Sequence, residues 1–163
     1  MLLIIILAVS GSYTLQALYV APARIPPREI IMMNCRETKS ILTRLEKADI
    51  STRLNRGADY DKLLSLMFAM NARLASNKIA APELADITAQ FGSEVAEFRS
   101  NYDIYNDDLG KANDIDCYAK PIEFYERLEN IRRSRAKLHE NVKHLRQLAD
   151  DYIDGFEMIV EAL

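Results

Sequence analysis

The sequence has no tryptophan, only two cysteines, and five residues each of glycine and proline among its 163 residues. So few cysteines exclude a small scaffold held by many disulfides, and so few glycines and prolines exclude a collagen-like or low-complexity chain. Hydrophobic residues make up 49% of the chain, which excludes an intrinsically disordered protein. The net charge of -3 gives no electrostatic argument for nucleic-acid binding. The length fits one ordinary domain.

The first 23 residues contain no charged side chain, and every Lys, Arg, Asp and Glu lies after them. An apolar stretch of about 20 residues is long enough to cross a bilayer as a helix. We therefore expect residues 1–23 to be a transmembrane anchor, or an uncleaved signal segment, that contacts membrane lipid. Residues 24–28, which hold two prolines and two arginines, are the expected linker. A cleaved signal peptide and a buried helix of a soluble protein are the alternatives.

Beyond the linker, residues 29–163 show helical periodicity and little strand-like alternation. The clearest apolar stripe follows Pro82, which suits the first position of a helix. Its members recur at steps of three and four residues: Leu84, Ile87, Phe91, Val95, Phe98, Tyr102, Tyr105 and Leu109. We predict an all-α fold, in which the N-terminal segment precedes an elongated antiparallel helical bundle or coiled-coil hairpin.

A second proline, Pro121, opens the next predicted helix, which extends to Asp154 and would be about 50 Å long. Its apolar stripe consists of Ile122, Tyr125, Leu128, Ile131, Leu138, Val142, Leu145, Ala149, Tyr152 and Phe156. Arg135 occupies the one step of this stripe that is not apolar. So long a helix in a small domain indicates an elongated shape.

The region before Pro82 is open to two interpretations. One apolar stripe consists of Ile31, Met33, Thr38, Ile41, Leu45 and Ala48, and another of Leu63, Met67, Met70 and Leu74. The residues around Gly57 resemble a break, which would give four helices. The spacing of Ile41 and Leu63, close to six helical turns, is also consistent with one long helix and three arms in all.

Cys35 and Cys117 are the only cysteines, and their separation does not match the spacing of a redox or zinc motif. In a layout of three arms, the turn after Asp116 returns to the level of Cys35. We therefore predict a disulfide between Cys35 and Cys117, which requires an oxidising compartment. Two unrelated buried thiols are the alternative. The disulfide favours a body outside the cytoplasm, whereas Arg24 and Arg28 favour a cytoplasmic body by the positive-inside rule.

Basic residues cluster in the last predicted helix, including Arg132, Arg133 and Arg135. A fold-back near residue 118 or 119 would place this region beside Glu94, Glu97 and Asp103. Opposite charges on neighbouring arms set the register of an antiparallel hairpin. We expect these six residues to have that structural role, and we expect no nucleic-acid partner.

No catalytic, metal or cofactor site is predicted. His139 and His144 are five residues apart and face different sides of a helix, unlike the four-residue spacing of a zinc-binding HExxH motif. Cys35 and His139 would act as nucleophile and base only if the fold happened to place them side by side, and no local motif predicts that. The sequence also lacks the glycine-rich loops that bind phosphate.

Two apolar clusters are candidate binding surfaces, although core packing explains both. Met67, Phe68 and Met70 form a soft, adaptable patch of the kind found in peptide-binding grooves. Aromatic residues gather near the second turn, and they are the candidate partner surface: Phe98, Tyr102, Tyr105, Tyr118, Phe124 and Tyr125. Tyrosines combine a large apolar ring with a polar hydroxyl, as is common at interfaces.

Our first hypothesis is a single-pass membrane protein with an extracytoplasmic helical body that binds or scaffolds and has no catalytic activity. It would recognise a protein partner, or a second copy of itself, through its helical faces. One alternative is an extracytoplasmic bundle that senses a small molecule, which requires polar groups such as Arg135 to converge in the core. Another is a subunit of a membrane complex that faces the cytoplasm.

Overall fold

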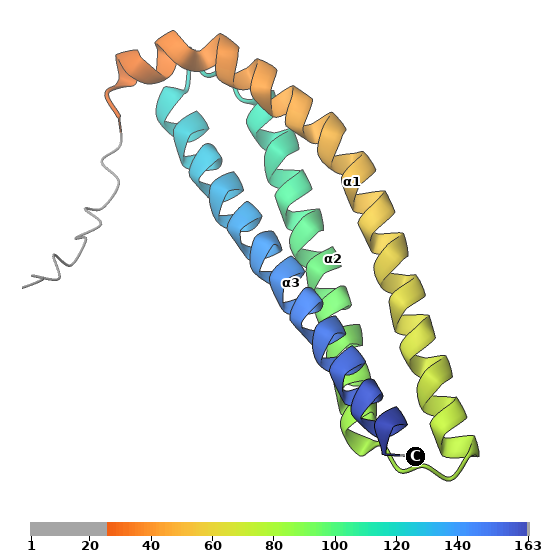
Figure 1. Cartoon of the computed structure of the whole chain (residues 1–163). Helices are drawn as coiled ribbons and strands as arrows, with labels where there is room; N and C mark the ends of the chain where they lie inside the picture. The colour runs from red at the N-terminus through yellow and green to blue at the C-terminus, as the bar shows by residue number, and fades with distance from the viewer. Residues whose placement is uncertain (1–25, 163) are drawn as a thin grey trace, which may run out of the picture.

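The computed structural model describes residues 26–162, and this part of the chain is all-helical, with no strand. It contains three helices: α1 (Arg28–Ser76), α2 (Pro82–Asp114) and α3 (Pro121–Glu161). They run up and down in an elongated antiparallel bundle (Figure 1). The predicted helical bundle is therefore confirmed. The predicted transmembrane segment at residues 1–23 lies outside the described residues, and none of the described helices is long and apolar enough to cross a membrane.

Of the two layouts that the sequence left open, the structure has the one with three arms. The helix α1 continues through Gly57 without a break and is 49 residues long. Each later helix starts with its proline at the first turn, Pro82 in α2 and Pro121 in α3. These positions suit proline because the first amides of a helix have no acceptor within the helix. α3 continues beyond the expected end at Asp154 to Glu161.

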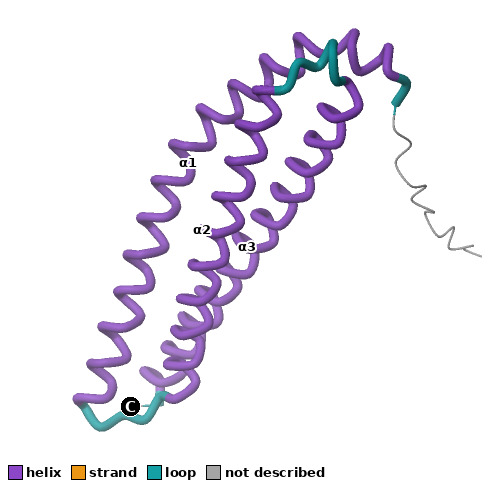
Figure 2. Tube along the Cα trace, turned by 180° about the vertical axis from the view of Figure 1, so that it is seen from behind, coloured by secondary structure: helices purple, strands orange, loops and turns teal. Residues whose placement is uncertain are grey.

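The N-terminal part of α1 lies across the end of the bundle where α2 and α3 are connected (Figures 1 and 2). A disulfide between Cys35 and Cys117, whose Cα atoms are 5.8 Å apart, joins this part of α1 to the connection. The predicted disulfide is therefore confirmed. We call this the disulfide end, and we call the opposite end, where α1 joins α2 and where α3 finishes, the distal end (Figure 1).

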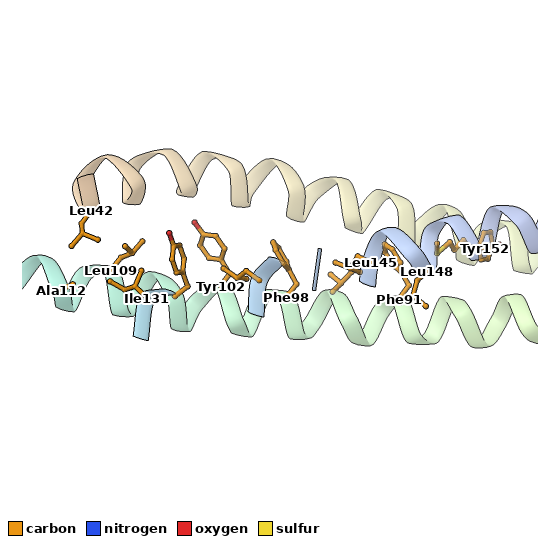
Figure 3. Packing of buried hydrophobic residues seen from close by; sticks show 14 of the residues in the cluster. Leu42, Phe91, Phe98, Tyr102, Leu109, Ala112, Ile131, Leu145, Leu148 and Tyr152 are labelled. Carbon is orange, nitrogen blue, oxygen red and sulfur yellow. The ribbon is translucent and has the colours of Figure 1, made fainter. Parts of the chain in front are cut away.

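The core is one cluster of buried side chains between the helices, part of which Figure 3 shows. The predicted stripe of α2 is confirmed, since every member is buried except Ile87, which is half-buried. In α1 the first stripe is only partly as predicted. Ile31 is buried, but the other buried positions there are Cys35 and Leu42, while Met33 and Ile41 are exposed.

The buried positions of α1 stop at Leu42 and resume at Met67. Between them no residue of α1 is fully buried: polar side chains from Asp49 to Arg56 face α2 and α3, and Tyr60, Leu63 and Leu64 are half-buried against the core. The middle of α1 is therefore packed less tightly than its two ends, and one of the two hollows described below lies beside it.

Candidate functional site

The helix α1 has one interface with α2 and another with α3, and side-chain contacts close the two interfaces to different degrees. We call each such interface between two helices a seam. Along α2, Arg53 pairs with Asp103 at 2.8 Å and Arg99 pairs with Asp61 at 2.6 Å. Along α3, the described hydrogen bonds come from one residue near the distal end. There the Tyr152 hydroxyl contacts the Met67 carbonyl oxygen at 3.1 Å and the Asn71 side-chain oxygen at 2.8 Å. The space between α1 and α3 is therefore the more open side.

Two hollows lie in this space. The first, which we call the central hollow, has a volume of about 260 Å³ and receives residues from all three helices. Its lining consists of Asp49, Thr52, Arg53, Arg56, Phe98, Tyr102, Tyr105, Arg135, Leu138, His139 and Val142. Three arginines and one aspartate give this lining a surplus of positive charge.

Two tyrosines of α2 reach toward α1 at the central hollow. The Tyr105 hydroxyl donates a hydrogen bond of 2.6 Å to the Asp49 carboxylate. Burial, and then this hydrogen bond, raise the pKa of Tyr105 well above its usual value. The Tyr102 hydroxyl also points toward α1 (Figure 3), with the Arg53 guanidinium 4.9 Å from the centre of its ring. That hydroxyl is buried and has no hydrogen-bond partner among the described residues.

The second hollow, which we call the distal hollow, has a volume of about 650 Å³ and lies between α1 and the end of α3. Its lining is mostly apolar, with two glutamates: Leu63, Leu66, Met67, Met70, Tyr152, Ile153, Phe156, Glu157, Val160 and Glu161. The exposed fractions of Leu66, Ile153 and Val160 are 59%, 51% and 52%. A set of apolar side chains this exposed at one place is typical of an interaction site.

The structure brings together three of the six aromatic residues that were expected to form a partner surface, since the rings of Phe98, Tyr102 and Tyr105 contact one another along α2. Phe98, Tyr102, Tyr105 and Phe124 are buried in the core, and Tyr125 is half-buried. Only Tyr118 is exposed, beside the disulfide. The first four lie on the inner faces of α2 and α3, where their rings contribute to the packing, and three of them, Phe98, Tyr102 and Tyr105, also line the central hollow.

The charged residues expected to set the register lie on the expected helices but do not pair with one another in the described structure. Arg132 contacts Glu129, and Arg133 contacts Asn130, each one turn earlier in α3. Arg135 lines the central hollow, and Asp103 pairs with α1. These arginines lie outside the seam between α2 and α3, where the buried positions of α3 are Ile131 and Leu138.

A different set of residues connects α2 with α3. The buried Asn141 side chain donates to the Glu94 carboxylate at 2.6 Å and accepts from Asn101 at 2.8 Å. His144 also contacts Glu94, at 2.9 Å. At the disulfide end of the same seam, Arg127 pairs with the buried Asp108 at 2.8 Å. Glu94 thus lies at the level that the fold-back predicted, with amide and imidazole partners in place of arginines.

The two histidines lie on different sides of α3, as predicted. His139 lines the central hollow, whereas His144 lies at the seam with α2. No group of three or more His, Cys, Asp or Glu residues between positions 26 and 162 is placed to hold a metal ion. Cys35 is bonded to Cys117 and is therefore not a free nucleophile.

The sequence singled out part of each hollow, since Phe98, Tyr102 and Tyr105 of the predicted aromatic surface line the central one. Met67 and Met70, singled out as an adaptable patch, both line the distal hollow, whereas Phe68 is exposed and is not in its lining. Arg135 was singled out as the charge in an apolar stripe, and it does line the central hollow. No sequence signal pointed to Asp49, Arg53 or Arg56, because spacing within α1 does not reveal which residues of α3 face them.

Searches with the whole chain found no matching protein-family model, no matching curated protein and no matching solved structure.

Proposed function

We propose that this protein is a non-catalytic binding protein that takes up an amphipathic helix of a protein partner in its distal hollow. The observation that carries the proposal is the exposed apolar lining between α1 and α3, which includes Leu66, Ile153 and Val160. A helix laid in this space would cover those side chains and extend the bundle from three helices to four, as in other helix-in-groove complexes.

The charge beside the distal hollow favours a basic partner over a second copy of the chain. From Ala149 onward, α3 carries five acidic residues and no Lys or Arg: Asp150, Asp151, Asp154, Glu157 and Glu161. Two copies joined symmetrically at this end would bring like charges together, which is unfavourable. Lysines or arginines flanking the apolar stripe of a partner helix would instead complement these carboxylates.

Two features support placing the body outside the cytoplasm, attached to a membrane by the N-terminal stretch. The first is the uncharged sequence of residues 1–23, which is long enough to span a bilayer. The second is the disulfide between Cys35 and Cys117, a bond typical of oxidising compartments. A body that faces the cytoplasm, within a membrane complex, is the competing arrangement.

Site-specific photo-cross-linking of the full chain in its native membranes tests the partner. A photoreactive residue placed at Ile153 should cross-link to one protein, in a segment that mass spectrometry identifies as an amphipathic helix with basic flanks. Leu66→Glu should abolish the product, because it puts a charge into the apolar lining. Leu54→Glu is the matched control, since Leu54 is exposed on the same helix and lies outside both hollows.

Three outcomes would contradict the proposed partner. They are a product that contains a second copy of this chain, a product that contains only lipid, and a product that survives Leu66→Glu. For the location, free thiols are alkylated with a membrane-impermeant reagent before lysis. Two thiols that become reactive together only after reduction support an extracytoplasmic body, whereas two free thiols exposed only by opening the membrane support a cytoplasmic one.

A further inference from the structure

The central hollow has a chemistry that the uptake of an apolar helix does not use. Arg53 and Arg56 enter it from α1, and Arg135 enters it from α3. Arginine remains charged at any physiological pH and presents a planar fork of donors that matches a carboxylate. Cationic groups therefore line two opposite sides of the same small space.

The charged partners already present do not neutralise this lining. Asp49 is the one carboxylate that lines the central hollow, and it already accepts a hydrogen bond from Tyr105. Arg53 pairs with Asp103 of α2. Within residues 26–162, neither Arg56 nor Arg135 forms an ion pair with a carboxylate. Two guanidinium groups on opposite sides of the hollow are thus available to an anion.

Tyr102 supplies an independent observation. Only 5% of this residue is exposed, it lines the central hollow, and its hydroxyl has no hydrogen-bond partner in the described structure. A buried hydroxyl left without a partner costs about 1–3 kcal/mol, so native proteins rarely retain one without a reason. This oxygen is closed off from solvent, so an acceptor atom of a ligand would complete the hydrogen bond once the Arg53 guanidinium, 4.9 Å from the centre of the Tyr102 ring, turns toward the ligand.

The remaining lining defines the shape of the ligand. Phe98, Leu138 and Val142 form an apolar part of the wall, contributed by α2 and α3. The volume of about 260 Å³ lies below the range of roughly 300–1,000 Å³ that holds drug-sized molecules. A small molecule with an anionic group at each end and a short hydrocarbon part between them matches the cations and the apolar wall together.

We propose that the central hollow binds a small organic dicarboxylate, with one carboxylate held by Arg56 and Arg53 on α1 and the other by Arg135 on α3. The Tyr102 hydroxyl donates to a carboxylate oxygen of the ligand. This site is independent of the proposed helix-binding role, because it uses different residues and a different part of the space between α1 and α3.

Titration of the purified full chain with glutarate tests this site, with calorimetry and thermal unfolding as the readouts. Glutarate should bind and raise the unfolding temperature, whereas butyrate, with one carboxylate, and inorganic phosphate, without the hydrocarbon part, should bind at least about tenfold more weakly. Arg135→Gln should weaken glutarate binding about tenfold or more. Arg133→Gln is the matched control, because Arg133 lies about 200° around α3 from Arg135 and lines neither hollow.

Tyr102→Phe separates a ligand-binding role from a structural one. Without ligand, this variant should be as stable as the wild type or more stable, because it removes a buried hydroxyl that has no partner. It should nevertheless bind glutarate more weakly. The proposal is overturned if glutarate does not bind, if butyrate or phosphate binds equally well, or if Arg133→Gln weakens binding as much as Arg135→Gln does.

Discussion

Cys35 near the start of α1 and Cys117 in the connection between α2 and α3 share a disulfide across 82 positions of sequence. It covalently ties the part of α1 that lies across the end of the bundle to the helices beneath it. Both cysteines are almost completely buried, and Ile31 and Leu42 extend the same core along α1. The covalent bond and the apolar contacts therefore hold the same segment in place.

Replacing both cysteines by alanine should lower the free energy of unfolding by on the order of 4 kcal/mol, the value of the chain-entropy model for a loop of this length. The loss should show as a lower midpoint in urea denaturation. Hydrogen exchange should accelerate most in the first turns of α1, because this segment loses its covalent tie. Reduction of the wild-type chain is the control and should reproduce both effects. An unchanged midpoint would mean that the apolar contacts alone hold this segment.

The pattern of the sequence predicted α2 well because its apolar residues are regularly spaced and large. Because all these residues lie on one face of the helix, that face is the one that packs against the other two helices. The prolines Pro82 and Pro121 likewise marked the starts of α2 and α3, since proline suits the first helical turn. The disulfide followed from the layout of the arms and not from any local motif.

The pattern of α3 was less informative because polar residues share its inner face. The sequence suggested Val142 as a member of the stripe and Arg135 as its one step that is not apolar, but Arg135 is exposed, Val142 is half-buried and the buried neighbour is Asn141. An asparagine can be buried when its amide is fully hydrogen-bonded, and the partners of Asn141 lie on α2. The hollows depend in the same way on how α1 lies relative to α3, and local spacing carries no information about that relation.

Asn141 should be sensitive to the exchange of its amide for a carboxylate. Its nitrogen lies 2.6 Å from an oxygen of Glu94, so Asn141→Asp would replace a hydrogen bond by a repulsion between a buried carboxylate and the half-buried carboxylate of Glu94. We expect Asn141→Ala to cost about 1–3 kcal/mol of unfolding free energy and Asn141→Asp to cost more at neutral pH. Asn55→Asp on the exposed side of α1 is the control and should stay within about 0.5 kcal/mol of the wild type. Urea denaturation measures the loss of unfolding free energy in each variant. Equal losses in the two Asn141 variants would mean that the charge added beside Glu94 has no effect of its own.

Two helical glycines should respond in opposite ways to alanine. At Gly57 an added Cβ atom would meet no atom within 4 Å, so Gly57→Ala should stabilise α1 by about 0.5–1 kcal/mol through helix propensity. At Gly155 the Cβ atom would lie 2.9 Å from a methyl carbon of Leu84, which is itself buried. Gly155→Ala should therefore give no gain or a loss, because the side chain of Leu84 has little room to move. Thermal unfolding of the two variants side by side measures the difference, and an equal gain in both would show that Leu84 relaxes freely.

Buried tyrosines should make the protein unfold in alkali. Burial is the largest cause of a raised pKa at four positions, namely Tyr60, Tyr102, Tyr105 and Tyr152. The folded chain therefore keeps these phenol protons at a pH where the unfolded chain has lost them. The buried tyrosines therefore contribute fully to the free energy of unfolding below about pH 10, the usual pKa of tyrosine. This contribution is lost progressively as the pH rises above that value.

Tyr105 allows the clearest measurement because it has the largest upward shift of pKa and is almost completely buried. In the wild type it should contribute about 1.4 kcal/mol per pH unit to the fall of the unfolding free energy above about pH 10. Tyr105→Phe should lower the free energy at neutral pH, since Asp49 loses a donor, but should reduce the alkaline slope by about that amount. Urea denaturation at several alkaline pH values measures both quantities. The same slope in the wild type and the variant would mean that Tyr105 ionises equally easily in the folded and unfolded chains, and burial would then not be what holds its proton.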